Sequence, residues 1–275
     1  MLNNDFSILF WGVRGSTPSP NKNTIQFGGN TPCVQIQAGK HLLILDAGTG
    51  ICQLGKSLIE QKEQIKAHIF ISHVHWDHIQ GIPFFLPLYE KNHQFIFYGE
   101  KKDNTPFSQI IKNIMTPPYF PITWDEIKAD CTFYEIYQDK TLHLDDHLTV
   151  KTLRLNHPDD ALGFRIEFEG KSCCYISDIE HQKTTESQLI QFIKNTDILI
   201  YDANFTEEEY IHKKGWGHST WQNGVKIAKK AYVKKLILFH HDPYRYDEEL
   251  ESIETQAKKI YPNTFAAKEG MHLFL

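Results

Sequence analysis

The sequence lacks the features that mark membrane, secreted and broadly nucleic-acid-binding proteins. No apolar run approaches the roughly 20 residues of a membrane-spanning helix, and the segment before Arg14 does not resemble a secretory signal. The five cysteines form no CxxC pair and no disulfide framework, which favours reduced thiols. A net charge of −5 leaves no basic excess for non-specific nucleic-acid binding. We therefore expect a cytoplasmic protein with no membrane partner.

Repeats, low-complexity segments and Gly/Ser linkers are also missing, so residues 1–275 are expected to form a single domain. Short apolar runs with flanking turn residues predict strands at 6–13, 33–38, 41–47, 68–72, 94–99, 148–155, 162–168, 172–177, 197–203 and 235–241. Helices are predicted at 50–62, after a Ser-Thr cap at 219–220, and at 247–260. Strands mixed with helices, without strict alternation, indicate an α+β fold.

The segment 100–130 is the least regular part of the sequence. It contains TPPYFPITWDE at 116–126, which is rich in proline and aromatic residues. We expect an inserted loop or lid rather than a core element. The alternative is a surface excursion that packs its own aromatic side chains.

The stretch FISHVHWDHIQG (70–81) concentrates residues that bind metals. Imidazole and carboxylate groups are common ligands of divalent cations. His73 and His75 are two residues apart, so an extended backbone can point both the same way. Asp77 and His78 are adjacent and suit a loop that enters a helix. Four ligands in two pairs indicate two metal ions; Trp76 and Ile79 are interpreted as packing residues.

The other ligands must come from elsewhere, and three later strands end in suitable residues. His157 follows the strand at 148–155, Asp178 follows the strand at 172–177, and His240 and His241 follow the run KLILF. Strand ends that carry histidine or aspartate can converge on one rim of a sheet. Strand alternation allows only one of the two late histidines to face the site, with the other turned toward substrate or an outer position.

This pattern of H-x-H-x-D-H at 73–78, a following His and Asp, and a late His resembles the metallo-β-lactamase fold, as does LLILDAGTG at 42–50 with Asp46. The resemblance covers nearly the whole chain and implies a four-layer αββα sandwich. It implies that the first metal is held by His73, His75 and His157, and the second by Asp77, His78 and His240, with Asp178 bridging both. His241 is the alternative to His240. Two zinc ions are expected, and manganese or iron would suit the same ligands.

The C-terminal stretch 201–243 is similar to ribonuclease Z and to related cyclic-nucleotide phosphodiesterases, including anti-Pycsar-like enzymes. In that branch an acidic residue, here Asp202, partners a histidine, here His218 of an H-S-T motif. Ribonuclease Z normally has glutamate and a His-Glu-Ala-Thr sequence, so this chain departs from it. No Gly- and basic-rich arm for tRNA is found, which favours a small phosphodiester over large RNA.

The resemblance predicts two-metal hydrolysis of a small phosphodiester or nucleotide, with a cyclic nucleotide as the expected substrate. His218, held by Asp202, would act as general acid, and Asp77 is counted with them as catalytic. The alternatives are tRNA 3′ processing, lactam or thioester hydrolysis, and nucleotide binding without turnover. Relatives imply a homodimer. Arg14 and Ser16, in GVRGSTPSP, are interpreted either as phosphate contacts or as turn residues.

Overall fold

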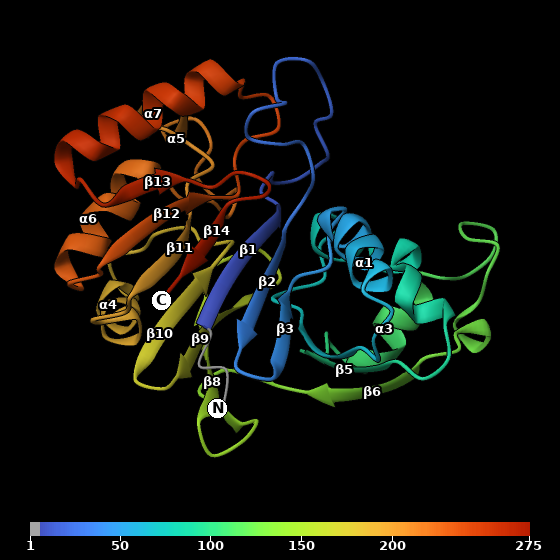
Figure 1. The fold of residues 1–275 in the computed structure, drawn as a ribbon. Helices are drawn as coiled ribbons and strands as arrows, with labels where there is room; N and C mark the ends of the chain where they lie inside the picture. Colours follow the sequence, from blue (N-terminus) through green and yellow to red (C-terminus); the bar gives the residue numbers. More distant parts are fainter. Residues whose placement is uncertain (1–5) are drawn as a thin grey trace.

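The computed structural model describes residues 6–275 and contains two seven-stranded β-sheets (Figure 1). The first sheet has the order β14-β1-β2-β3-β4-β5-β6. Its strands are β1 (Phe6–Gly12), β2 (Cys33–Ala38), β3 (His41–Leu45), β4 (Lys66–Phe70), β5 (Gln94–Gly99), β6 (Asp130–Glu135) and β14 (His272–Phe274). The chain thus returns at its C-terminal end to pair antiparallel with its first strand.

The second sheet has the order β13-β12-β11-β10-β9-β8-β7. Its strands are β7 (Thr141–His143), β8 (Leu148–Leu155), β9 (Ala161–Phe168), β10 (Lys171–Ile176), β11 (Ile198–Asp202), β12 (Lys235–Phe239) and β13 (Thr264–Ala266). Strands β10 to β13 run parallel, so the carboxyl ends of β10, β11 and β12 lie at one edge. The predicted strands at 162–168 and 172–177 correspond to β9 and β10, which pair antiparallel as a hairpin.

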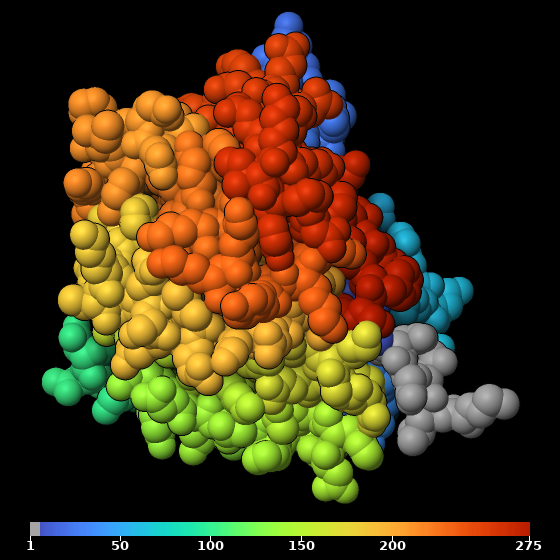
Figure 2. All heavy atoms as spheres, turned by 90° about the vertical axis from the view of Figure 1, so that its left-hand side faces the viewer, coloured from blue at the N-terminus to red at the C-terminus, as the bar shows by residue number. Residues whose placement is uncertain are grey.

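Helices cover the outer face of each sheet (Figure 1). On the first sheet lie α1 (Gly50–Glu60) and α3 (Phe107–Asn113). On the second lie α4 (Glu186–Ile193), α6 (Trp221–Lys230) and α7 (Asp247–Ile260), and Figure 2 shows the face that this late part of the chain covers. The short helices are α2 (Trp76–Ile79), α5 (Glu207–Tyr210), and the 3₁₀ turns Ile82–Phe84, Leu86–Tyr89 and Trp124–Glu126. The layers confirm the αββα sandwich.

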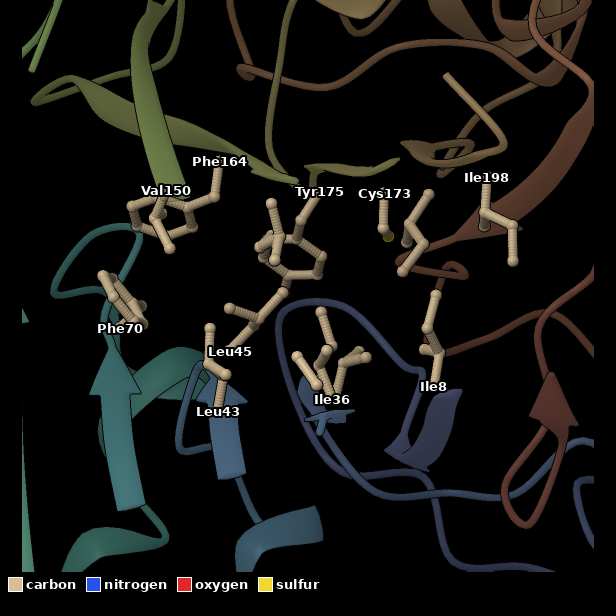
Figure 3. Packing of buried hydrophobic residues seen from close by; sticks show 14 of the residues in the cluster. Ile8, Ile36, Leu43, Leu45, Phe70, Val150, Phe164, Cys173, Tyr175 and Ile198 are labelled. Atoms are coloured by element: carbon tan, nitrogen blue, oxygen red, sulfur yellow. The ribbon is translucent and has the colours of Figure 1, made fainter. Parts of the chain in front are cut away.

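The main hydrophobic core lies between the two sheets. Ile36 and Leu45 of the first sheet face Phe164 and Tyr175 of the second, and all four are fully buried (Figure 3). Alternate residues of β3 and β4 instead face α1 and α3, where a second core forms. Burial on both faces explains why these strands read as continuous apolar runs in the sequence.

The predicted strands agree with the structure to within two residues at most ends, and the helix predicted at 247–260 has those bounds. The strands β6, β7, β13 and β14 and the helices α3 and α4 were not predicted. Three of these strands have only three residues, and β6 is largely exposed, so none has a strong apolar pattern. Within residues 6–275, no helix is both long and apolar enough to cross a membrane.

The segment 100–130 differs from the inserted loop that its sequence predicts. It is a crossover that connects the parallel strands β5 and β6 and contains α3. Phe107, Ile111 and Met115 of this segment are fully buried, and the first two pack in the core beneath α1 and α3. Only its first residues, 100–103, line a hollow beside the histidine cluster. A role as a lid stays a prediction for these residues alone.

A buried histidine makes stability sensitive to acid. His68 on β4 is 8% exposed and stacks on Tyr98. Burial, and secondarily the charges of His41 and Lys66, lower the pKa of His68 to about 4. Between pH 6.5 and 4 the unfolded chain therefore binds more protons at this position, and the free energy of unfolding falls as the pH falls.

Replacing His68 with phenylalanine should remove this contribution. We expect the loss of unfolding free energy between pH 7 and pH 5.5 to be smaller by about 1 kcal/mol in His68→Phe than in the wild type. Urea denaturation at several pH values measures it. His212→Gln, at an exposed position, is the control. Parallel pH profiles for His68→Phe and the wild type would contradict the assignment.

Candidate metal centre

The predicted ligands of the loop 73–78 follow strand β4 and point to one place. His73 lies in the loop between β4 and α2, and His75, whose backbone is extended, is the N-cap of α2. Asp77 and His78 lie in α2 itself, as the sequence predicts for a loop that enters a helix. Asp77 and His78 still converge, because Asp77 Oδ2 is 3.2 Å from His78 Nε2.

Three histidines form the first group of possible ligands. Nε2 of His73 is 2.9 Å from Nδ1 of His75, and Nε2 of His157 is 3.1 Å from the same atom. His157 comes from the end of β8, on the other sheet from His73. Asp178 Oδ2 completes this side, at 3.8 Å from His73 Nε2 and 3.7 Å from His157 Nε2.

Asp77, His78 and His240 form the second group. His240 Nε2 is 3.2 Å from Asp77 Oδ2. Asp178 Oδ1 is 3.3 Å from Nε2 of both His78 and His240. One oxygen of Asp178 thus faces each group, which is the position that a bridging ligand needs. All seven predicted ligands come together; their assignment as ligands stays a prediction.

Hydrogen bonds made by the histidine nitrogens that point away from the cluster leave the inner nitrogens free to bind cations. Nδ1 of His157 donates to the carbonyl of Gly217 at 2.7 Å, and Nδ1 of His78 donates to Asp46 at 2.7 Å. Because a carbonyl and a carboxylate only accept, both Nδ1 atoms carry hydrogen and both Nε2 atoms offer a lone pair to the cluster. His78 Nε2 and Asp178 Oδ1 are buried and have no hydrogen-bond partner. The residues therefore fit two divalent cations.

The electrostatics of the cluster agree with this. Burial, followed by the charge of His78, lowers the pKa of His73 well below its usual value, and burial also lowers the pKa of His157. Metal ligands must be neutral imidazoles, so these shifts favour binding. For His78, burial is outweighed by the carboxylates of Asp77, Asp178 and Asp46, which raise its pKa. That side of the cluster favours a positive charge, which a bound cation would supply.

Asp46 supports the cluster through hydrogen bonds to its residues, a function that the sequence did not predict. It follows β3 and is fully buried. Besides His78 Nδ1, its carboxylate accepts from Ser72 N at 2.7 Å, Ser72 Oγ at 2.8 Å and Tyr175 Oη at 2.7 Å. Carboxylates that bond the outer nitrogen of a ligating histidine fix the ring and raise its basicity.

Replacing Asp46 with asparagine should therefore weaken metal binding by roughly 10–100-fold. Competition with a chelator, followed by metal analysis, measures the affinity. Tyr175→Phe removes one hydrogen bond to Asp46 but leaves the carboxylate, and should have a smaller effect. Equal affinities for Asp46→Asn and the wild type would contradict this role.

Three residues at the cluster have a left-handed backbone conformation, which directs their polar groups toward it. Ser16, Asp46 and His240 have φ values of 62°, 58° and 57°. Such conformations are costly for residues other than glycine and gather at functional sites. Gly15 lies so close to His240 that a Cβ there would be 2.3 Å from its Nδ1. The Ser16 N–H donates to Asp77 Oδ2 at 2.7 Å.

Asp202 and His218 form a pair at the edge of the cluster. His218 Nδ1 donates to Asp202 Oδ2 at 3.0 Å and lies 3.8 Å from Asp178 Oδ2. Burial lowers the pKa of His218, but the charge and hydrogen bond of Asp202 outweigh it and raise the pKa to about 9. Asp202 is fully buried, and it also accepts from Ile179 N at 3.1 Å. Asp202 can therefore orient His218 but cannot touch a substrate.

Glu180 fastens the loop that precedes His218, a role that the sequence did not suggest. Its carboxylate accepts from Gly215 N at 2.9 Å, Gly217 N at 3.0 Å and Tyr210 Oη at 2.8 Å. Burial raises the pKa of Glu180, but these donors outweigh it and lower the pKa. Glu180 thus helps to place both the Gly217 carbonyl, which holds His157, and the neighbouring His218.

A family model described as a beta-lactamase superfamily domain matches residues 41–241. The match spans most of the chain and includes the whole cluster. The chain belongs to this superfamily. The resemblance inferred from the sequence, the fold class and the assignment to a superfamily of hydrolases are confirmed.

Several superfamily members are similar along their whole length. Ribonuclease Z of Oceanobacillus iheyensis is 26% identical over 313 aligned positions, which cover 95% of this chain and 97% of the relative. The metallo-beta-lactamase fold protein YhfI of Bacillus subtilis has a TM-score of 0.76 at 21% identity and covers 99% of this chain and 100% of its own. A diphosphatase from the PhnP family has a TM-score of 0.71 at 18% identity, with coverage of 98% and 97%. These two structures support the fold alone.

Three interpretations of the superfamily motifs need correction. Arg14 is fully buried and donates to the backbone carbonyls of Gly28 and Arg245, at 2.8 Å and 2.6 Å, so it cannot contact phosphate. His241 is also buried and bonds the carbonyl of Ala267 at 2.9 Å, away from any substrate. Trp76 is 67% exposed and therefore does not pack the loop, whereas Ile79 does.

Two hollows adjoin the candidate metal site. The smaller, of about 430 Å³, lies directly over the cluster and is lined by Ser16, Trp76, Asp77, Asp178 and His218, together with Val74 and His75. The larger, of about 690 Å³, shares Val74 and His75 with it and extends toward residues 100–103. A ligand at the cluster can therefore occupy both.

Proposed function

We propose that this protein is a metal-dependent phosphodiesterase that hydrolyses a small phosphodiester, a cyclic nucleotide being the expected substrate. The observation that supports it most is His218, which is bonded to the buried Asp202 and lines the same hollow as Asp77 and the bridging candidate Asp178. Such a pair offers a proton beside a dinuclear centre, as the departure of an alkoxide requires. A thiolate leaves without a proton, so thioester hydrolysis has no comparable need for an acid at this place.

His73, His75 and His157 would hold the proposed first cation, Asp77, His78 and His240 would hold the second, and Asp178 would serve both. We propose zinc for both, because imidazole and carboxylate ligands suit it. Bound as a pair, the cations would acidify the attacking water and offset the negative charge of the phosphate.

The other steps belong to the side chains. His218 uses Nδ1 to bond Asp202, so Nε2 is the nitrogen that can pass a proton to the leaving oxygen. Asp202 keeps the ring oriented and favours its protonated form. The Ser16 side chain is exposed in the hollow, so a contact to a phosphate oxygen stays a prediction.

Ribonuclease Z activity is the second candidate, because whole-length relatives carry that name. The alignment to the Oceanobacillus protein has 313 positions, more than the 275 residues of this chain, so that relative contains segments that are missing here. A chain without an arm for tRNA is better suited to a small substrate. We also propose a homodimer, as the resemblance implies, which light scattering of the purified protein tests.

A substrate panel tests the proposed function. The metal-analysed protein is incubated with 3′,5′- and 2′,3′-cyclic nucleotides, cyclic dinucleotides, precursor tRNA, nitrocefin and a thioester. Turnover of a cyclic nucleotide is expected. Cleavage of precursor tRNA alone would establish the second candidate, and turnover of only nitrocefin or the thioester would overturn both. Tight nucleotide binding without product would indicate a binding protein.

A further inference from the structure

The larger hollow beside the cluster is the feature that the proposed function leaves unexplained. Its volume of about 690 Å³ is within the range of small-ligand sites. His73 and His75 line it and also belong to the first group of candidate ligands. A group esterified to a phosphate at the cluster would therefore extend into this hollow.

The charge of the walls opposes a second phosphate. Five carboxylates line the hollow, at Glu100, Asp103, Glu135, Asp159 and Asp160, against three cations, at Lys101, Lys102 and Arg154. Two of the cations are already engaged. Arg154 donates to both oxygens of Glu100 and is 3.3 Å from Asp160 Oδ2, and Lys102 donates to the carbonyls of Asp159 and Asp160.

Lys101 is the cation whose side chain makes no hydrogen bond or ion pair within the described chain. Of the five carboxylates, Asp103 and Glu135 make no ion pair within the described chain, and burying a second phosphate against them would cost free energy. The walls thus favour an uncharged group, and carboxylates such as Glu135 and Asp103 can accept hydrogen bonds from hydroxyls.

One wall of the hollow is apolar. Ile136 is buried, and Tyr137 is 56% exposed beside it; both follow directly after β6. Lys140 Nζ lies 5.3 Å from the centroid of the Tyr137 ring, and this cation–π contact helps to hold the ring in place. An exposed aromatic ring can stack on a planar base, and the carboxylates next to it can accept hydrogen bonds from sugar hydroxyls. A nucleoside carries both groups.

The geometry points to a nucleoside subsite in this hollow, with Tyr137 as a specificity-determining residue and the surrounding carboxylates selecting against a second phosphate. This inference rests on the proposed phosphodiesterase function and narrows its substrate to a nucleoside ester with a single phosphate. An RNA strand carries one negative charge per nucleotide, so its additional phosphates would be repelled by these carboxylates.

Two chromogenic esters with the same leaving group test this. Thymidine 5′-(p-nitrophenyl phosphate) and methyl p-nitrophenyl phosphate release the same p-nitrophenol, so the ratio of their kcat/KM values measures the nucleoside alone. We expect the wild type to prefer the thymidine ester by about 10–100-fold, the range that stacking provides. Tyr137→Ala should reduce this ratio about tenfold. Tyr119→Ala, at an 88% exposed position outside the hollow, should keep it.

A third ester tests the charge of the walls. Adding a 3′-phosphate to the thymidine ester should lower kcat/KM about tenfold, and the double variant Asp103→Asn, Glu135→Gln should restore most of the loss. Two results would overturn the proposed subsite. One is the same thymidine-to-methyl ratio of kcat/KM values in the wild type and in Tyr137→Ala, and the other is faster turnover of the ester with the extra phosphate. Failure to cleave even the methyl ester would instead refute the phosphodiesterase function, so the two failures are distinguishable.

Discussion

Replacing Asp178 with alanine is expected to lower kcat/KM by at least about 10³-fold and to reduce the metal content below two ions per chain. The carboxylate presents Oδ2 to His73 and His157 and Oδ1 to His78 and His240. Its loss would remove a ligand from both proposed cations at once. Charge stabilisation by bound metals contributes several kcal/mol, and each 1.4 kcal/mol is a tenfold change in rate.

The measurement combines metal analysis of the purified variant with kinetics on a p-nitrophenyl phosphodiester. Asp145→Ala is the matched control, because Asp145 bonds His41 and takes no part in the cluster. Circular dichroism shows whether the Asp178 variant is folded, and Asp178→Asn, which keeps the shape of the side chain, separates loss of the ligand from loss of packing. Two ions per chain and wild-type turnover in Asp178→Ala would refute the bridging role.

The second large effect concerns His218. His218→Ala should lower kcat about 10²–10⁴-fold for esters with an alcohol leaving group, such as a cyclic nucleotide, while metal content is kept. The reason is that an alkoxide must gain a proton as it leaves. p-Nitrophenolate is stable without one, so the same variant should lose less than about tenfold with a p-nitrophenyl ester.

The difference between the two leaving groups is the decisive observation. His212→Ala, an exposed histidine of the same loop, should show neither loss. If His218→Ala slowed both esters equally and also lost metal, His218 would be a ligand rather than an acid. Asp202→Asn should give the same dependence on the leaving group in weaker form, because it keeps the hydrogen bond but removes the charge that favours protonated His218.

Much of the fold and of the candidate site could be predicted because it depends on local patterns. The apolar runs of β2, β5 and β8 have the predicted bounds, since strand formation follows from side-chain alternation and flanking turns. The four ligands of the loop 73–78 are neighbours in sequence and could be recognised together. The ends of β8, β10 and β12 contributed His157, Asp178 and His240, because strand ends gather at the edges of a sheet.

The rest was decided by tertiary structure. The choice of His240 over His241 depends on the left-handed backbone at His240, with φ 57°, and on Gly15 from the far end of the chain. The bonds from Asp46 to His78 and from Gly217 to His157 join residues 32 and 60 positions apart. Arg14 lay within a suggestive motif and is nevertheless buried. Contacts of this kind depend on how the two sheets pack, and no local pattern in the sequence records that packing.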